Sequence, residues 1–250
     1  MPASAFPPRN LFVTGDDFGA SPEINAAIEQ YHRAGALHCA SLMVDARYVE
    51  EAMEIARRNP SLCVGLHLTL CEDSPALAGL RYAFSPAARR WLPGEIRRQF
   101  DRFHALGLPP LYWDGHTHLH LHPVVLANTL PIVREHGFRF TRLVREPGAS
   151  ALLPLIFRAL SRAAIPRLQE HGIGFADQVF GLRHTGRMSG DAFRGAITAA
   201  KGIAEIYFHP GVDPAPEPEE LAALLVEKRD LGPRMSANKG RSSWTNQHLS

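Results

Sequence analysis

Hydrophobic residues along this chain fall into short apolar runs separated by longer amphipathic stretches. The apolar runs predict strands near residues 10–14, 40–44, 63–70, 111–120, 138–143, 174–180 and 203–208. The amphipathic stretches predict helices near residues 22–34, 48–58, 93–105, 123–136, 151–171, 189–199 and 217–226. Strands that alternate with helices favour a parallel sheet built from βαβ units. We therefore predict an α/β fold, a single distorted (β/α) barrel of the TIM-barrel type with about seven βα units.

The length and composition fit one domain. The chain has 250 residues, of which 45% are hydrophobic, and this suffices for the core of one barrel. We expect a flexible N-terminus over residues 1–9 and a barrel domain over residues 10–226. Residues 227–250 become polar and are expected to form a disordered or atypical tail.

The segment over residues 71–92 predicts a long, irregular connection suited to substrate binding. Its apolar side chains could equally pack as a small flap. Arg89, Arg90, Arg97 and Arg98 lie beside apolar residues and indicate an amphipathic helix. We expect this helix to pack on the barrel or on a second copy in preference to a membrane surface.

The net charge and the cysteine content of the chain argue against several classes of function. A net charge of +2 gives no signal of a nucleic-acid partner. The three cysteines include no Cys-x-x-Cys pair, which excludes a thiolate zinc knuckle and argues against a disulfide framework. The N-terminal residues lack a signal-peptide pattern, and no apolar run is long enough to cross a membrane. We therefore expect a soluble, cytoplasmic protein.

Two adjacent carboxylates, Asp16 and Asp17, follow the first predicted strand. Ser21 and Pro22 then mark the start of a helix. The acids are therefore expected on the loop at the C-terminal end of a strand, where α/β folds place their sites. An isolated pair of this kind more often shapes a turn. Histidines farther along the chain favour a functional interpretation.

These histidines recur at later strand ends. His67 lies in an alternating strand, and His209 ends the last strand just before a Pro-Gly turn. Between them, four polar residues are spaced by two, so an extended backbone would direct them to one face. They are Asp114, His116, His118 and His120.

Imidazole and carboxylate donors together suit Zn²⁺ and related divalent ions. Three protein ligands with an open position are typical of a catalytic rather than a structural site. Such a site lowers the pKa of water toward ~7 and polarises a carbonyl, while a second carboxylate accepts a proton and a separate histidine donates one. The residues therefore predict metal-assisted hydrolysis.

Five motifs occur in the order and spacing of the YdjC-like carbohydrate deacetylase family, and the resemblance covers about residues 10–225. They are residues 14–19, 41–44, 64–68, 114–120 and 209–211. The resemblance implies a distorted (β/α) barrel, one divalent ion, zinc or magnesium, and removal of an acetyl group from an N-acetylated amino sugar. It also implies a homodimer.

Residues 176–182, Ser189 and residues 204–210 resemble the hopanoid-biosynthesis-associated branch of that family. This resemblance implies a substrate in which N-acetylglucosamine is attached to a polyhydroxylated hopanoid. A glycolipid substrate would also favour a peripheral contact with a membrane. Gly15 stands where the family usually has alanine, a small-for-small change that should leave the acids in place.

The family resemblance assigns roles to five residues. Asp17, His67 and His116 match the metal ligands, Asp16 matches the general base, and His209 matches the residue that protonates the departing amine. The role of His209 in protonation or in substrate binding stays open.

Five more residues are candidates for substrate binding or for orienting the ligands. Asp114 is placed to orient a ligand imidazole. His118 and His120 could line the sugar pocket or replace His116 as ligand. Arg142 and Arg145 could bind sugar hydroxyls, hold Asp16 ionised, or be solvated loop cations.

Three other functions use the same donors. A chitooligosaccharide deacetylase of the same family would differ only in substrate. A phosphoesterase or another amidohydrolase would be favoured by two closely spaced metals. A metal-binding protein without turnover would keep the site and release no acetate.

Overall fold

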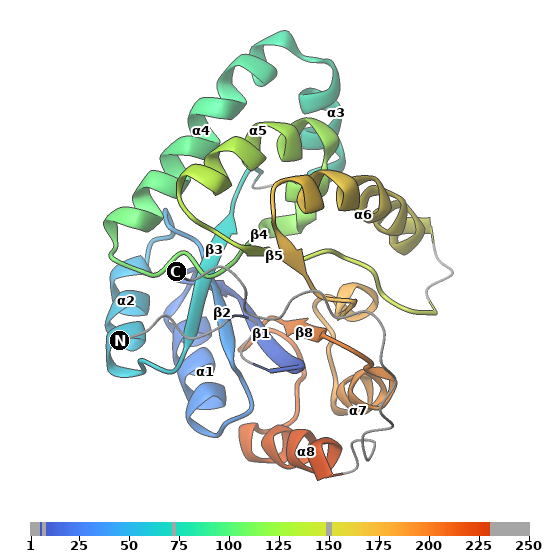
Figure 1. Ribbon diagram of the computed structural model, residues 1–250. Coiled ribbons are helices and arrows are strands. Elements are labelled where there is room, and N and C mark those ends of the chain that lie inside the picture. The colour runs from blue at the N-terminus through green and yellow to red at the C-terminus, as the bar shows by residue number, and fades with distance from the viewer. Residues whose placement is uncertain (1–5, 7–8, 72–73, 149–151, 231–250) are drawn as a thin grey trace, which may run out of the picture.

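The computed structural model describes Phe6 and residues 9–71, 74–148 and 152–230. Eight parallel strands form one curled sheet in the order β6-β5-β4-β3-β2-β1-β8-β7 (Figure 1). The strands are β1 (Leu11–Phe18), β2 (Cys39–Leu42), β3 (Cys63–Leu68), β4 (Trp113–Gly115), β5 (Phe140–Thr141), β6 (Gly174–Phe175), β7 (Gln178–Phe180) and β8 (Ala204–Phe208).

Helices follow most of the strands and cover the outside of the sheet (Figure 1). They are α1 (Pro22–Arg33), α2 (Val49–Arg58), α3 (Pro75–Phe84), α4 (Pro86–Ala105), α5 (Pro123–Glu135), α6 (Leu152–Glu170), α7 (Gly190–Ala199) and α8 (Pro218–Asp230). Two 3₁₀ turns, η1 (His116–Leu121) and η2 (Leu182–His184), follow β4 and β7. The prediction of an α/β, TIM-like barrel fold is confirmed.

The barrel remains open between β6 and β7, which are the two edges of the sheet. The sequence predicted one strand over residues 174–180, but β6 pairs with β5 while β7 pairs with β8. At Asp177 the chain changes partner, because its backbone N–H and its carboxylate both bind the backbone of Ile203 beside β8. Eight short strands therefore replace the seven expected.

Side chains that face the inside of the barrel form an apolar layer and a polar layer. The apolar layer near the N-terminal ends of the strands includes Phe12, Cys39, Cys63, Tyr112, Phe140 and Val179. Two or four residues farther along the same strands lie the buried polar residues Thr14, Asp16, Ser41, His67, Asp114 and Arg142. Because strand side chains alternate, a polar residue at these positions must enter the barrel near its C-terminal end.

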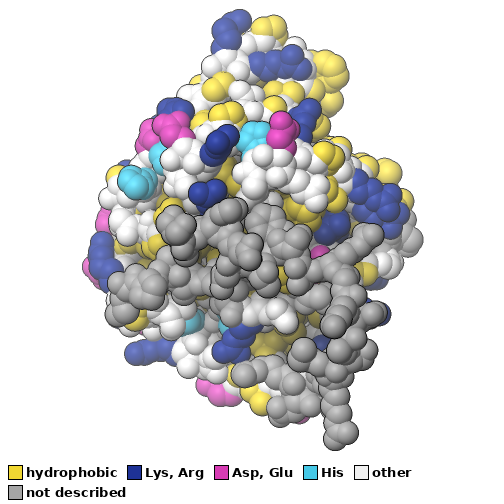
Figure 2. Space-filling view, in the orientation of Figure 1, with side chains coloured by type: hydrophobic (Ala, Val, Ile, Leu, Met, Phe, Trp, Pro, Cys, Tyr) yellow, Lys and Arg dark blue, Asp and Glu magenta, His cyan; other side chains and the backbone are white. Residues whose placement is uncertain are grey.

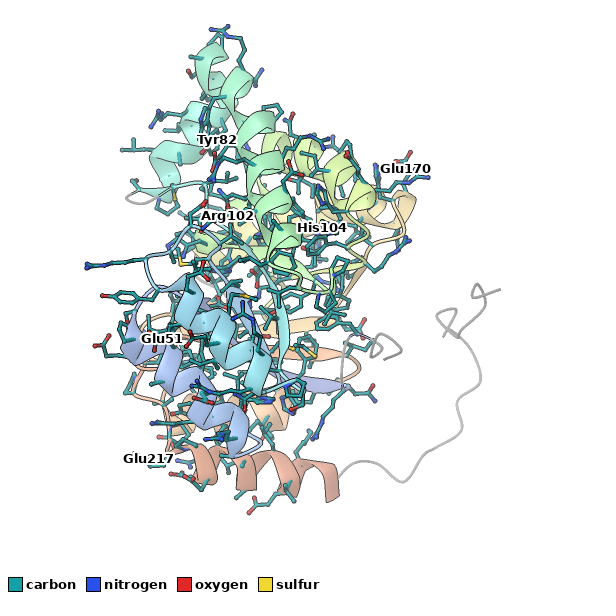
Figure 3. All side chains as sticks on the ribbon, turned by 90° about the vertical axis from the view of Figure 1, so that its left-hand side faces the viewer. Glu51, Tyr82, Arg102, His104, Glu170 and Glu217 are labelled. Atoms are coloured by element: carbon teal, nitrogen blue, oxygen red, sulfur yellow. The ribbon has the colours of Figure 1, made fainter. Side chains whose placement is uncertain are left out.

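Residues 75–94 form a helical lobe rather than the irregular connection predicted there. Ser74 and Ser85 cap α3 and α4, since their hydroxyls accept hydrogen bonds from Leu77 N and Ala88 N. Each serine precedes a proline in the first helical turn, the same signal that begins α1. We call residues 75–94 the α3–α4 lobe; Figure 3 shows Tyr82 in it, above Arg102 of α4.

The structure describes part of each segment expected to flank the barrel domain. Helix α8 continues to Asp230, beyond the predicted end at residue 226, and the rest of the expected tail lies outside the described residues. In the expected flexible N-terminus, Phe6 packs on the rings of Phe12, Tyr112 and Phe140. No helix among the described residues is long and apolar enough to span a membrane.

We predict that Gly65→Ala destabilises the barrel. Gly65 lies on β3 with the ring of Tyr112 directly against it, so an added methyl group would overlap the ring. Overpacking of this kind costs about 1–3 kcal/mol. Urea unfolding should therefore show a lower free energy of unfolding.

The matched control is Gly94→Ala on α4, where an added methyl group meets no atom within 4 Å. Alanine should raise stability there by up to about 1 kcal/mol, because glycine is a poor helix former. Equal stability of the two variants would contradict the close contact between Gly65 and Tyr112.

Candidate metal centre and surrounding site

The candidate residues meet at the C-terminal edge of the sheet. Asp16 and Asp17 lie at the end of β1, His67 near the end of β3, Asp114 in β4 and His209 directly after β8. In the sheet β1 lies beside β8 and β3 lies beside β4, with β2 between the two pairs. The fold therefore gathers the residues at the edge where parallel α/β barrels place their sites.

A bulge at the end of β1 allows both adjacent carboxylates to reach the site. The pairing of β1 with β2 shifts register between Gly15 and Phe18, and Asp17 has a φ of 63°. Both acids lie within the strand, not on the loop predicted for them. The bulge is needed because neighbouring side chains in a regular strand point to opposite faces. Asp16 enters the barrel, and Asp17 turns toward two histidines.

Asp17, His67 and His116 bring three donor atoms together. Asp17 Oδ1 lies 3.1 Å from His116 Nδ1 and 3.4 Å from His67 Nε2. Ligands at normal zinc distances in a tetrahedral site are roughly 3.4 Å apart. Burial alone would raise the pKa of Asp17, but hydrogen bonds from both imidazoles lower it overall. The donor set therefore fits one divalent cation.

Asp114 orients His67 from the opposite side of its ring. Asp114 Oδ1 lies 2.6 Å from His67 Nδ1, which leaves His67 Nε2 directed at Asp17. Burial lowers the pKa of His67, while the charge of Asp114 and the hydrogen bonds with Asp114 and Asp17 outweigh it and raise that pKa to about 10. A carboxylate behind a ligand histidine fixes its ring and increases its basicity. Asp114 is therefore placed to fix the ring of His67.

Arg142 is buried between three carboxylates. Its guanidinium binds Asp16 through two hydrogen bonds of 2.7 and 2.8 Å, Glu205 at 2.9 Å and Asp114 at 3.0 Å. The guanidinium carbon also lies 4.4 Å from the centre of the Tyr207 ring. Arg142 is only 1% exposed, so the structure supports its contact with Asp16 rather than a sugar-binding or solvated position.

The strand prediction for residues 111–120 is wrong beyond Gly115. Strand β4 ends there, and Thr117 and His118 have positive φ angles in the η1 turn. His116 alone of the three histidines in this segment contacts Asp17. The spacing by two therefore does not place these side chains on one face.

His118 and His120 form hydrogen bonds with other parts of the barrel. His118 Nε2 lies 2.9 Å from the hydroxyl of Tyr207, and His120 Nε2 lies 2.9 Å from the backbone carbonyl of Arg142. Burial lowers the pKa of both, that of His120 to about 4. Because both rings bind elsewhere, His116 is the histidine of η1 that lies beside Asp17.

Arg145 lies apart from the carboxylate cluster. Its guanidinium donates to the backbone carbonyl of Ala176 at 3.2 Å and lies over the ring of Phe175. Both contacts are at the open side of the barrel, near β6. Arg145 is therefore not placed to hold Asp16, and Arg142 takes that position.

His209 is held by Asp213, four residues farther along. Asp213 Oδ2 accepts a hydrogen bond from the His209 backbone N–H at 2.7 Å and lies 3.3 Å from its Nδ1. Burial lowers the pKa of His209, but Asp213, with help from Asp16 and Asp17, raises it overall. Asp213 therefore favours the protonated form of the His209 ring.

Sequence reasoning missed four supporting residues: Ser41, Glu205, Tyr207 and Asp213. Ser41 donates a hydrogen bond to Asp114 at 2.8 Å. Glu205 is a charged residue inside an otherwise apolar strand, a signal that could have marked it. Asp213 carried no such signal, because its contact with His209 depends on the turn after β8.

Comparison with known proteins identifies the family of this chain. Residues 10–234 match a family model described as YdjC-like protein. The chain belongs to this family. This YdjC-like protein is 32% identical over 252 residues to a carbohydrate deacetylase of Mus musculus, and the match covers 85% of this chain and 81% of that protein. It is 34% identical over 139 residues to a carbohydrate deacetylase of Brevibacillus brevis, covering 50% and 56% of the two chains.

Solved structures support the fold of this YdjC-like protein. A crystal structure of a candidate cellobiose-phosphate cleavage protein from Enterococcus faecalis V583 superposes with a TM-score of 0.58 and 19% identity, covering 80% of each chain. An uncharacterised protein from Agrobacterium tumefaciens C58 superposes with a TM-score of 0.51 and 14% identity, covering 88% of this chain and 82% of that one. At these identities the likeness concerns the fold alone.

We predict that Asp213→Asn lowers the pKa of His209. The asparagine keeps a hydrogen-bonding side chain but removes the negative charge that stabilises the imidazolium. A nearby opposite charge shifts a pKa by about 1–3 units, so loss of this charge should move the titration of His209 to lower pH. NMR titration of the His209 ring in chelator-treated protein would measure it. An unchanged pKa would show that Asp213 does not stabilise the charged form.

Proposed function

We propose that this protein is a metal-dependent deacetylase that removes the acetyl group from an N-acetylated amino sugar. The observation that carries the proposal is the convergence of Asp17, His67 and His116 beside Asp16 and His209. The carbohydrate deacetylases among its relatives point to the same reaction. A bound divalent ion, zinc or magnesium, would polarise the acetyl carbonyl and make water a stronger nucleophile.

Two residues beside the proposed cation position carry out the two proton transfers of the reaction. Arg142 fixes the Asp16 carboxylate through two hydrogen bonds, so Asp16 is oriented to accept a proton from attacking water. His209, whose charged form is favoured by Asp213, donates a proton to the departing nitrogen. The products are acetate and a free amine.

The arrangement favours one metal ion over two. A second group of possible donors consists of Asp16, His67 and Asp114. Arg142 already binds both of these carboxylates, and its positive charge opposes a cation there. This observation disfavours the two-metal phosphoesterase among the alternatives.

Paired variants of the two acids test the proposal. Asp17→Ala should lose bound zinc and acetate release together, because it removes a ligand. Asp16→Asn should keep the zinc but lower kcat by about 10²–10⁴-fold, because it removes a general base. Metal content and acetate release from an N-acetylated sugar are measured on the same preparations. Full turnover by Asp16→Asn would refute its role as base, and a metal-loaded wild type without turnover on any acetylated sugar would favour the non-catalytic alternative.

We further propose that the substrate is N-acetylglucosamine attached to a hopanoid. An apolar hollow of about 520 Å³ supports this substrate, because it lies in the α3–α4 lobe directly after β3. Its lining includes Leu70, Cys71 and Trp91. Cys71 Sγ lies 3.3 Å from the hydroxyl of Thr117, the residue after His116. A rigid apolar group attached to the sugar could therefore lie beside the metal centre.

Acetate release from the glycosylated hopanoid and from short chitooligosaccharides separates the two proposed substrates. We expect release from the hopanoid at a higher kcat/KM. Trp91→Ala should reduce that preference without affecting turnover of a short sugar, because truncation removes one wall of the hollow. Release from the short sugars alone would keep the deacetylase and refute the hopanoid substrate.

A further inference from the structure

The outer surface of the α3–α4 lobe exposes large apolar side chains in the same short segment as unpaired arginines. Leu77, Leu80, Phe84 and Trp91 are 62%, 56%, 79% and 51% exposed. Figure 2 shows hydrophobic side chains together with Lys and Arg side chains on the upper part of the molecule, where α3 and the beginning of α4 lie. Side chains of this size are rarely left in water as a group.

The positive charge of the lobe is not balanced by acids. Between Asp73 and Glu95 the sequence contains Arg81, Arg89 and Arg90 and no acidic residue. Among the described residues none of these three arginines forms an ion pair, and Arg89 instead donates to the backbone carbonyls at the end of α3.

Arginines farther along α4 behave differently. Arg97 pairs with Glu135, while Arg98 and Arg102 pair with Asp45. Within α4, the arginines without an ion pair therefore lie in the part of the helix that also carries the exposed Trp91.

We propose that the α3–α4 lobe is a docking surface for an anionic lipid bilayer. Apolar side chains beside arginines are the combination that binds the interface of such a membrane, because the apolar groups enter the acyl boundary while the cations meet the headgroups. An anionic membrane would account for the exposed apolar side chains of the lobe, for its arginines and for the lack of acidic residues between Asp73 and Glu95. The lobe begins directly after β3, so docking would hold the C-terminal edge of the barrel near the membrane.

Vesicle flotation of the full-length protein tests this proposal without using its catalytic activity. The wild type should float with mixed phosphatidylcholine–phosphatidylglycerol vesicles, bind pure phosphatidylcholine vesicles weakly, and dissociate as salt is raised. The double variant Leu80→Ser/Phe84→Ser should weaken binding about tenfold or more, because it removes two large apolar groups. The double variant Arg81→Gln/Arg90→Gln should lose the preference for anionic vesicles.

Two matched controls distinguish the lobe from a general effect of surface changes. Val226→Ser removes an apolar side chain on α8 that is 52% exposed, and Arg97→Gln removes a paired arginine on α4. Both should bind vesicles like the wild type. Turnover of a water-soluble acetylated sugar should be unchanged in all four variants, so that loss of vesicle binding is separable from any failure of the proposed reaction.

Three results would overturn the proposal. Wild-type protein that is folded yet fails to bind anionic vesicles would exclude the membrane as partner. Equal weakening by the lobe variants and the controls would exclude the lobe as the docking surface. A concentration-dependent dimer that Leu80→Ser/Phe84→Ser abolishes, measured by light scattering without vesicle binding, would assign the surface to a second copy of the chain.

Discussion

The site depends on one buried arginine that holds three carboxylates inside the barrel. Arg142 joins Asp16 of β1, Asp114 of β4 and Glu205 of β8, so a single guanidinium connects three strands. Without it, three negative charges would lie close together away from water, and breaking a buried pair costs about 3–5 kcal/mol. Burial already raises the pKa of Glu205 despite the arginine. Arg142 therefore fixes the positions of the three carboxylates and offsets their negative charge.

The geometry of the candidate metal centre depends on this cluster. Arg142 binds Asp114, and Asp114 binds Nδ1 of His67, whose Nε2 is then directed at Asp17. On the other side, Arg142 occupies both oxygens of Asp16 and keeps this carboxylate out of the cation position. The adjacent residues Asp16 and Asp17 therefore have different surroundings although their side chains are the same. One acid can bind a cation, while the other is held beside it for proton transfer.

Backbone strain is concentrated at the same place. Asp17, Thr117 and His118 are the non-glycine residues of the described chain with positive φ angles, and such conformations cost about 1–3 kcal/mol each. Asp17 and His116 approach each other because β1 is bulged and β4 ends early. The surrounding hydrogen bonds offset this strain, among them those from His118 to Tyr207 and from His120 to the backbone of Arg142.

Periodicity and local signals in the sequence determined the parallel α/β barrel, since apolar runs and amphipathic stretches report which faces are buried. They also placed the candidate residues at strand ends, and the Ser-Pro pairs at residues 74 and 85 mark the starts of α3 and α4, where the sequence predicted an irregular connection. Spacing could not determine the path after Gly115, because η1 is stabilised by contacts with β8 and with the residues after β5. Only the tertiary structure selected His116 over His118, brought Asp213 to His209 and placed Arg142 between three strands. Those choices depend on contacts between residues distant in sequence, which no local pattern records.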